Sequence, residues 1–475
     1  MTPDEFRAAA HELVDWVADR RADVESRPVR PDVEPGDIAA RLPTEPPELP
    51  VGADQVLRDL DEIIAPGITE VQHPMHFGWF PANASLSSVL GDFASSGLAS
   101  LGISWESSPA LTEVEEVVVD WLRQLTGLDD GWHGVIQDTA SSACLVALLA
   151  ARERATGHSQ MTTGLTGVAE PPCVYVTTEA HSSVRKAALL AGFGADHIRL
   201  VDVDPWTRDM LPEALAASMA ADLAAGLRPA VVVASAGSTS TTAFDPIGAI
   251  VAAAARHGAW VHVDAAMAGS ALLLPEMRGL FSGLEGADSL SWNPHKWMGT
   301  ILDCSLMYVR DPHHVIQVMS TDPSYLRSTA GGEAIQYRNW GVPLGRRFRA
   351  LKLWYQLRID GVEAIQTRLR RDLDNARWLA EQFRDLPDWE VVAPVRLQTV
   401  CVRHLPRRLD DPARTEELDA HTLGWVRAIN TSGAAFLSPS MLGDRWMVRV
   451  SVGVESTERH HLECLIGLMQ EAAAT

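Results

Sequence analysis

The stretch AVVVASAGSTSTTAFDPIGAIVAAAARHGAWVHVD, residues 230–264, decides the fold. It begins and ends with a short β-branched run, and an alanine-rich helical run lies between them. Two more strand-like runs, CVYVTT at 173–178 and IRLVDV at 198–203, alternate with helical stretches in the same way. This alternation predicts right-handed crossovers and an α/β fold whose mostly parallel sheet is covered on both faces. Such sheets bind their ligands at the carboxyl ends of the strands.

Three segments with different patterns suggest the domain organisation. Residues 1–85 contain an amphipathic helix and a proline-rich extended strap, and neither has much of a core of its own. Residues 86–346 carry the α/β pattern and form the expected large domain. Residues 347–475 begin with a long amphipathic helix and continue with alternating strands and a closing helix, which predicts a small α+β domain.

Composition and charge narrow the classes of function. The 475 residues include 62 acidic and 40 basic ones, a net charge of -22, and no basic run of the kind that binds nucleic acid. No apolar run approaches the roughly 20 residues of a membrane helix, and the acidic start lacks the layout of an export signal. We therefore expect a cytoplasmic protein without a membrane partner. Five scattered cysteines without paired spacing predict buried thiols rather than a zinc site or disulfides.

A lysine and an aspartate occupy positions at which a cofactor would bind. The run ADSLSW leads directly into NPHKW, which contains Lys296, and the strand WVHVD ends on Asp264. Taken singly, the lysine could lay its stem on apolar surface and the aspartate could cap a turn. Neighbouring strands, however, would bring both side chains to the same edge of the sheet. Together they indicate a cofactor pocket.

Other strand ends carry residues suited to a flat, phosphorylated cofactor. An apolar strand turns through residues 139–142 (TASS) into a helix, and the free N–H groups of such a helix start bind anions, although ordinary capping explains the same residues equally well. His181 follows the strand CVYVTT, and Thr239 lies in a hydroxyl-rich turn after AVVVAS. Each is a weak candidate alone. A lysine, an acid, a flat ring and an anion-binding helix start are together what pyridoxal phosphate (PLP) requires.

A series of motifs runs along nearly the whole chain in a fixed order: RPDVEPG, FGWFPANAS, SWESSPALTEVEEVVVDWL, GVIQDTASSACLVALLAAR, EAHSSV, HVDAAMAGSA, NPHKW and VPLGRRFRALKLW. In this series the sequence resembles the aromatic L-amino acid decarboxylases of the group II PLP-dependent decarboxylase family. The resemblance implies the aspartate aminotransferase-like fold of fold type I, PLP as cofactor, and decarboxylation of an aromatic amino acid to an arylethylamine and CO2.

The resemblance also implies roles for individual residues. Lys296 would form the covalent link to the cofactor aldehyde, Asp264 would pair with the pyridine nitrogen, and His181 would stack on the ring. The further cofactor-binding residues that it implies are Ala140, Ser141, Thr239 and Asn293. Tyr325 lies in a Ser/Thr/Gly-rich stretch typical of a mobile lid and would reprotonate the substrate Cα. Relatives with phenylalanine at this position resemble aldehyde synthases, so Tyr325 favours the amine product.

The expected substrate pocket is apolar. The positions that match the family's side-chain pocket are Trp79, Phe80, Leu101, Ile103, Met267 and Gly345. Gly345 stands where a serine is associated with histidine-type or phenolic substrates, and glycine leaves more room. Ala82, Ile103 and Met267 depart from the family pattern in ways that weaken polar contacts to a catechol. Among tryptophan, phenylalanine, tyrosine and DOPA, we therefore expect a tryptophan-like or phenylalanine-like substrate.

The resemblance further implies a homodimer, with the N-terminal segment wrapped on the partner. Two alternatives stay open at this point. One is an aromatic acetaldehyde synthase or another group II decarboxylase on the same scaffold. The other is a cofactor-binding sensor without turnover, against which the intact Lys296, Asp264 and Tyr325 argue.

Overall fold

The computed structural model describes residues 1–320 and 334–474, which divide into two compact units. Unit 1 comprises Met1–Pro81, Trp378–Val392 and Cys401–Thr475, and unit 2 comprises Ala82–Arg377 and Ala393–Val400. The domain boundaries after residues 85 and 346, which the sequence pattern suggests, stay a prediction.

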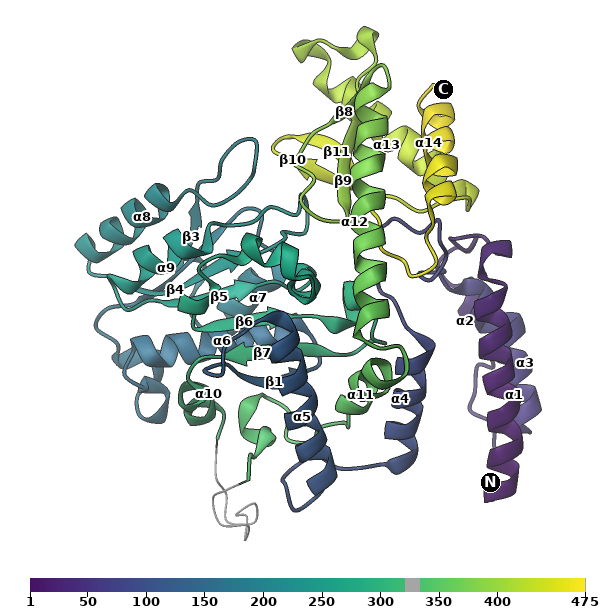
Figure 1. Ribbon diagram of the computed structural model, residues 1–475, viewed down its shortest axis with the longest axis horizontal. Helices are drawn as coiled ribbons and strands as arrows, with labels where there is room; N and C mark the ends of the chain where they lie inside the picture. Colours follow the sequence, from purple (N-terminus) through teal and green to yellow (C-terminus); the bar gives the residue numbers. More distant parts are fainter. Residues whose placement is uncertain (321–333, 475) are drawn as a thin grey trace. The chain divides into compact units, whose positions relative to one another are not determined.

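The large sheet belongs to unit 2 and has, among the described residues, seven strands in the order β1-β7-β6-β5-β4-β2-β3 (Figure 1). The strands are β1 (His133–Gln137), β2 (Pro172–Thr177), β3 (Ile198–Val201), β4 (Arg228–Ser235), β5 (Trp260–Asp264), β6 (Ser289–Trp292) and β7 (Ser305–Val309). Strands β3, β2, β4, β5 and β6 pair in parallel, whereas β7 pairs antiparallel with both β6 and β1. The prediction of an α/β fold with a mostly parallel sheet is confirmed.

Helices cover both faces of this sheet (Figure 1). They are α5 (Pro109–Thr126), α6 (Ala140–Ala155), α7 (Ser182–Leu190), α8 (Pro212–Ala224), α9 (Ile247–Ala255) and α10 (Pro312–Met319). The core under α6 and α7 includes Val174, Val231 and Ala147, which have no exposed surface. Fully burying a side chain of valine size contributes about 1.5–3 kcal/mol, so near-continuous runs such as VVVAS stabilise a central strand on both faces.

Other α-helices of the described part of unit 2 lie beside the sheet. They are α4 (Leu86–Leu98), α11 (Ala350–Ile359) and the first part of α12 (Val362–Asp385). Helix α4 packs closely on α11 at Gly91, where an added Cβ would lie 2.5 Å from the carbonyl oxygen of Leu351. Glycine is therefore required at this crossing.

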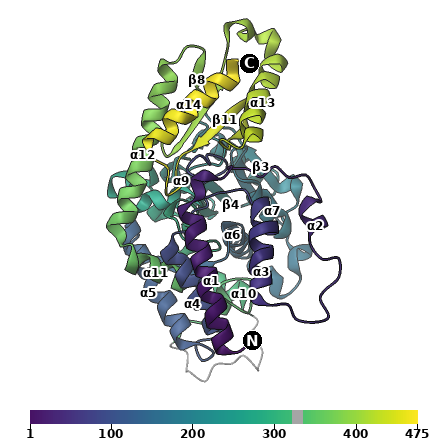
Figure 2. The same cartoon turned by 90° about the vertical axis from the view of Figure 1, so that its right-hand side faces the viewer.

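Unit 1 combines the N-terminal helices with a second sheet in the order β10-β11-β9-β8. Its elements include α1 (Pro3–Ala22), α2 (Asp37–Arg41), α3 (Ala53–Asp59), β8 (Trp389–Val391), β9 (Thr399–His404, whose first two residues belong to unit 2), α13 (Thr415–Ser432), β10 (Ser438–Leu442), β11 (Arg445–Ser451) and α14 (Arg459–Ala474). The predicted N-terminal helix is present and begins with a capping box between Thr2 and Glu5. Figure 2 shows α1 and α3 side by side.

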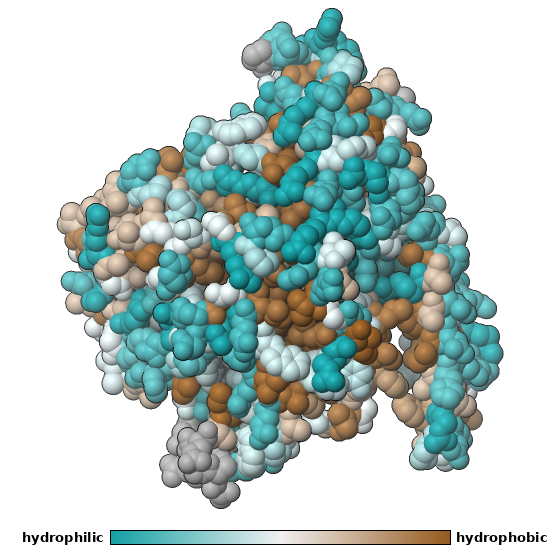
Figure 3. Space-filling model, viewed as in Figure 1, coloured by the Kyte–Doolittle hydropathy of each residue, from teal (hydrophilic) through white to brown (hydrophobic). Residues whose placement is uncertain are grey.

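Large apolar side chains are exposed on several helices, among them α1 and α4. On α1, Phe6, Leu13 and Val14 are 51%, 42% and 49% exposed, and on α4 the exposed side chains include Leu90 and Phe93. Figure 3 shows hydrophobic side chains at the surface around α4. Across the described part of the chain, no helix is both long enough and apolar enough to cross a membrane.

Candidate active site

The carboxyl ends of β4, β5 and β6 meet at one edge of the large sheet. In register, Asp264 at the end of β5 lies between Ser235 of β4 and Ser291 of β6. Its carboxylate accepts hydrogen bonds from the backbone N–H of Ala266 at 3.0 Å and the hydroxyl of Ser291 at 3.5 Å. Because β6 leads within a few residues into Lys296, the structure brings the lysine and the aspartate to the same edge, as the strand order predicts.

Lys296 lies on a single helical turn, Pro294–Met298, that surrounding helices hold firmly. Arg368 of α12 donates hydrogen bonds to the carbonyl oxygens of Trp297 and Met298 at 2.6 and 2.9 Å, and Gln356 of α11 donates to Met298 O at 3.2 Å. Lys296 itself is half-buried, whereas the other residues of the turn are buried. The backbone of the turn is thus fixed by residues of two other helices.

His181 caps the N-terminus of α7 through its Nδ1 atom, which accepts from the backbone N–H of Ser183 at 3.2 Å. Partial burial lowers the pKa of His181, the positive charge of Lys296 lowers it further, and the negative charge of Asp264 opposes both. The three side chains therefore lie within electrostatic reach of one another. The imidazole keeps an exposed surface, so a neutral, flat ring is available for stacking.

An anion can bind at the start of α6. Thr139 is the N-cap, and its side chain accepts from the backbone N–H of Ser142 at 3.4 Å. The backbone N–H groups of Ala140 and Ser141 have no acceptor among the described residues. Two open donors at a helix N-terminus fit a phosphate group. Asp138 directly precedes the N-cap, and its carboxylate accepts a hydrogen bond from the backbone N–H of Thr139 at 2.7 Å.

Two other predicted cofactor residues lie at the same edge. Thr239 is half-buried in the loop after β4. The loop begins at Gly237, whose φ of +78° and close approach to Ala268 exclude a side chain. Asn293 is 3% exposed, and its side-chain oxygen has no hydrogen-bond partner in the part of the chain that the structure describes. A buried acceptor of this kind is expected where a bound molecule completes the site. The residues present therefore fit PLP.

The predicted substrate-pocket residues are only partly brought together. In unit 2, Leu101 and Gly345 are neighbours, since a Cβ on Gly345 would lie 3.7 Å from Leu101 Cδ1. Ile103 is half-buried nearby in sequence, and its N–H donates to Ser107 Oγ at 3.1 Å. Met267 is buried, and its sulfur accepts from Gln398 Nε2 at 3.2 Å.

The other predicted positions are not in the described part of unit 2. Trp79 and Phe80 belong to unit 1, where the Trp79 ring packs 4.9 Å from that of Phe436 and the Arg449 guanidinium lies 4.8 Å above the Phe80 ring. Tyr325 lies outside the described residues.

Sequence reasoning missed the residues that hold the lysine turn. Gln356, Arg368 and Asp372, whose carboxylate accepts from Trp297 Nε1 at 3.0 Å, come from helices far along the chain. The signal that could have found Gln356 is weak: it lies two residues after the motif VPLGRRFRALKLW, which indicates the family but no role for Gln356.

Comparison with known proteins decides the family. Residues 35–405 match the family model described as the pyridoxal-dependent decarboxylase conserved domain. The chain belongs to the pyridoxal-dependent decarboxylase family. A tryptophan decarboxylase of Camptotheca acuminata is 37% identical over 482 residues, which cover 100% of this chain and 95% of that one. A phenylacetaldehyde synthase of Arabidopsis thaliana is 36% identical and covers 100% and 97%.

A solved structure of this decarboxylase family agrees with the fold. A crystal structure of Oryza sativa TDC with PLP and tryptamine superimposes with a TM-score of 0.96 at 36% identity, covering 100% of this chain and 98% of that chain. The predictions of the family, of a PLP-dependent carboxy-lyase and of PLP as its cofactor are confirmed.

Proposed function

We propose that this decarboxylase converts an aromatic L-amino acid into its arylethylamine and CO2. The observation that carries the proposal is the meeting of Lys296, Asp264 and His181 at one sheet edge beside the anion-binding start of α6. The aromatic substrate class is supported by the apolar contact between Leu101 and the open Gly345 position, and by relatives named for tryptophan and phenylacetaldehyde.

Each residue of the proposed site has a separate task. Bound PLP supplies an aldehyde for covalent attachment and an electron sink for the bond that breaks. Lys296 provides the nucleophilic amine, and the clamped turn aims it. Asp264 would hold a proton at the ring nitrogen, and the ring of His181 would stack on the cofactor. Thr239, Asn293 and the N–H groups of Ala140 and Ser141 hold its polar groups. Tyr325 would return a proton to the substrate Cα.

A substrate panel tests the proposal. The purified protein, loaded with PLP, is given tryptophan, phenylalanine, tyrosine, DOPA and, as a non-aromatic control, leucine, and CO2, amine, aldehyde and peroxide are measured. We expect amine and CO2 in equal amounts from at least one aromatic substrate and neither from leucine. Aldehyde with peroxide would favour an acetaldehyde synthase, and bound cofactor without CO2 from any substrate would favour a sensor.

Replacing Tyr325 with phenylalanine is expected to divert the product from amine towards aldehyde. The phenol is the proposed proton donor, and without it the substrate carbon stays unprotonated long enough to react with oxygen. Amine and aldehyde are measured together by chromatography. Tyr337→Phe is the matched control, because Tyr337 is buried beneath the Arg346 guanidinium at 4.9 Å. An unchanged amine yield in Tyr325→Phe would remove the proposed role.

We also propose that the active form is a cytoplasmic homodimer. A second copy would cover the exposed apolar side chains of α1 and α4, which a monomer leaves in water. Cys144, Cys173, Cys304 and Cys401 are buried thiols, as is usual in a reducing compartment. Cys464 is exposed, so the prediction of five buried thiols is wrong at this position, which lies outside the buried face of α14.

A further inference from the structure

Lysine is rare in this chain, which makes its placement informative. Of the 40 Lys and Arg residues three are lysine: Lys186, Lys296 and Lys352. Lys186 is exposed on α7, whereas Lys352 of α11 has no exposed surface. A fully buried ammonium is stable only where nearby oxygens offset its lost hydration. A compact ammonium in so arginine-rich a chain indicates a site that a guanidinium does not fit.

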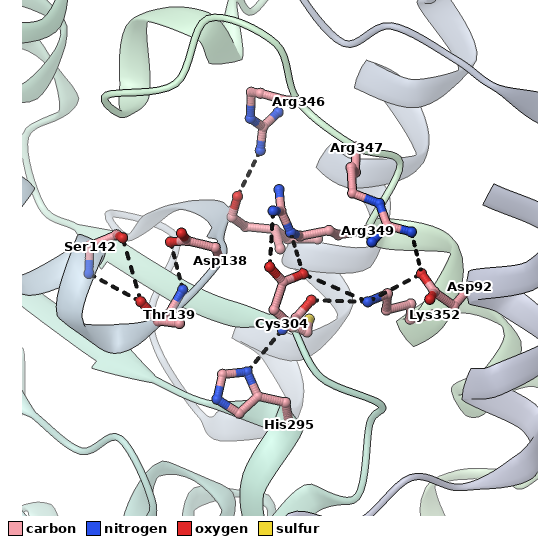
Figure 4. Close-up of polar contacts among 12 residues, drawn as sticks. Asp92, Asp138, Thr139, Ser142, His295, Cys304, Arg346, Arg347, Arg349 and Lys352 are labelled. Atoms are coloured by element: carbon pink, nitrogen blue, oxygen red, sulfur yellow. Dashed lines mark hydrogen bonds and ion pairs between the residues drawn. The ribbon is translucent and has the colours of Figure 1, made fainter. Parts of the chain in front are cut away.

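The oxygens that surround Lys352 come from two separate segments. Its Nζ lies 3.2 Å from Asp92 Oδ1 of α4 and donates to the carbonyl oxygen of Asp303 at 3.2 Å. The Asp303 carboxylate, 3.8 Å from Nζ, also accepts two hydrogen bonds from Arg349 at 2.9 and 3.2 Å. Figure 4 shows the Lys352 ammonium pointing toward the Asp92 carboxylate, which Arg347 contacts from its other side.

Asp303 stays ionised in this cluster. Burial alone raises the pKa of its carboxyl group, but hydrogen bonding by Arg349 and the charges of Arg349 and Lys352 outweigh burial and lower the pKa below its usual value. Two cations from one end of α11 therefore fix the position of Asp303.

Asp303 is connected to the lysine turn through the next residue. The backbone N–H of Cys304 donates to His295 Nδ1 at 2.9 Å (Figure 4). The backbone N–H of His295 donates in turn to Cys304 O at 3.3 Å. His295 directly precedes Lys296. The segment 303–304 is therefore hydrogen-bonded to the residue that directly precedes Lys296.

We propose that Lys352 is a positioning residue for Lys296, acting through Asp303 and the Cys304–His295 hydrogen bonds, with Asp92 as its counter-ion. The inference rests on the proposed function, in which Lys296 attaches the cofactor. Gln356 and Arg368 hold the carbonyl groups that follow Lys296, and Lys352 holds the returning chain. Without it, Asp303 and Asp92 would each lose a buried cation.

Lys352→Met tests this, because methionine keeps the length and apolar stem but lacks the charge. We expect kcat at saturating substrate to fall by about 10- to 100-fold, because a reacting group that is slightly misplaced lowers the rate by this order. KM should change by less than about twofold. The visible circular dichroism of the bound cofactor should change, since it reports the orientation of the lysine-linked ring. In the protein without cofactor, hydrogen exchange at the Cys304 and His295 amides should accelerate by about tenfold.

Two further variants keep the test decisive. Asp92→Asn, at a side chain that is 27% exposed, should produce the same changes to a smaller degree and serves if Lys352→Met does not fold. Arg347→Gln is the matched control. Arg347 contacts the same Asp92 at 3.1 Å but is 51% exposed, so its loss should leave kcat and the exchange rates within about twofold of the original protein.

The outcomes separate this inference from the proposed function. If the unmodified protein releases CO2 and Lys352→Met or Asp92→Asn retains its kcat, dichroism and exchange rates, the positioning role is wrong. A merely structural role would lower the melting temperature without changing the dichroism or the balance of kcat and KM, and would also overturn it. If the unmodified protein attaches PLP at Lys296 but decarboxylates nothing, the proposed function is wrong. The hydrogen exchange and dichroism measurements then still test whether Lys352 positions Lys296.

Discussion

Lys296→Ala is expected to abolish turnover and covalent attachment of PLP. Alanine removes the amine that forms the covalent link, and loss of a nucleophile of this kind lowers kcat by at least about 10³-fold. Folding should be preserved, because Arg368 and Gln356 donate hydrogen bonds to the backbone of the turn and these bonds do not involve the lysine side chain. The measurements are CO2 release and the mass of peptides after borohydride reduction, which makes the cofactor link permanent.

The small number of lysines makes this experiment sharp. A label on a lysine side chain can fall on one of three peptides, which contain Lys186, Lys296 or Lys352. Lys186→Ala is the matched control, since Lys186 is exposed on α7, and this variant should label and turn over like the original protein. A label found on the peptide of Lys186 or Lys352 would contradict the assignment of Lys296.

Much of the fold was predictable because the strands have a clear sequence pattern. Runs such as VVVAS in β4 and WVHVD in β5 are apolar on both faces, and helices of suitable length lie between them. The order of Asp264 and Lys296 at one edge follows from that topology, since consecutive parallel strands end on the same side. The resemblance then assigned roles that no single residue type reveals, such as those of Thr239 and Asn293.

The antiparallel strand and the clamp around the lysine were not predictable in the same way. Strand β7 reverses direction because the lysine turn connects it to β6 without a crossover helix, and periodicity does not encode direction. Arg368 and Lys352 occur in arginine-rich helical stretches, whose charged side chains a sequence pattern places in solvent. Their burial depends on contacts with distant residues, 49 positions away for Lys352 and Asp303 and 71 for Arg368 and Trp297, which a local pattern does not contain.

Asp264→Asn is expected to lower kcat by about 10²- to 10⁴-fold, the range that loss of a correctly placed proton costs. Asparagine has nearly the same shape and can still accept from the N–H of Ala266, which donates to Asp264 at 3.0 Å. It lacks the negative charge that would keep a proton on the ring nitrogen, so the cofactor would bind but accept electrons poorly. Steady-state CO2 release measures kcat, and the absorbance of the dialysed protein measures retained cofactor.

The decisive comparison uses the opposite end of the same sheet. Asp288 directly precedes β6 and therefore lies at the amino end of that strand, opposite to the edge that carries Asp264. It is half-buried, forms an ion pair with Arg154 at 2.6 Å and accepts a hydrogen bond from the backbone N–H of Val261 at 2.8 Å. Asp288→Asn should lower stability and leave kcat nearly unchanged. If both variants lose activity alike, the loss reflects weakened folding of the sheet. If Asp264→Asn alone loses activity while it retains cofactor, the charge of Asp264 acts on the bound ring, and full activity in Asp264→Asn would exclude that role.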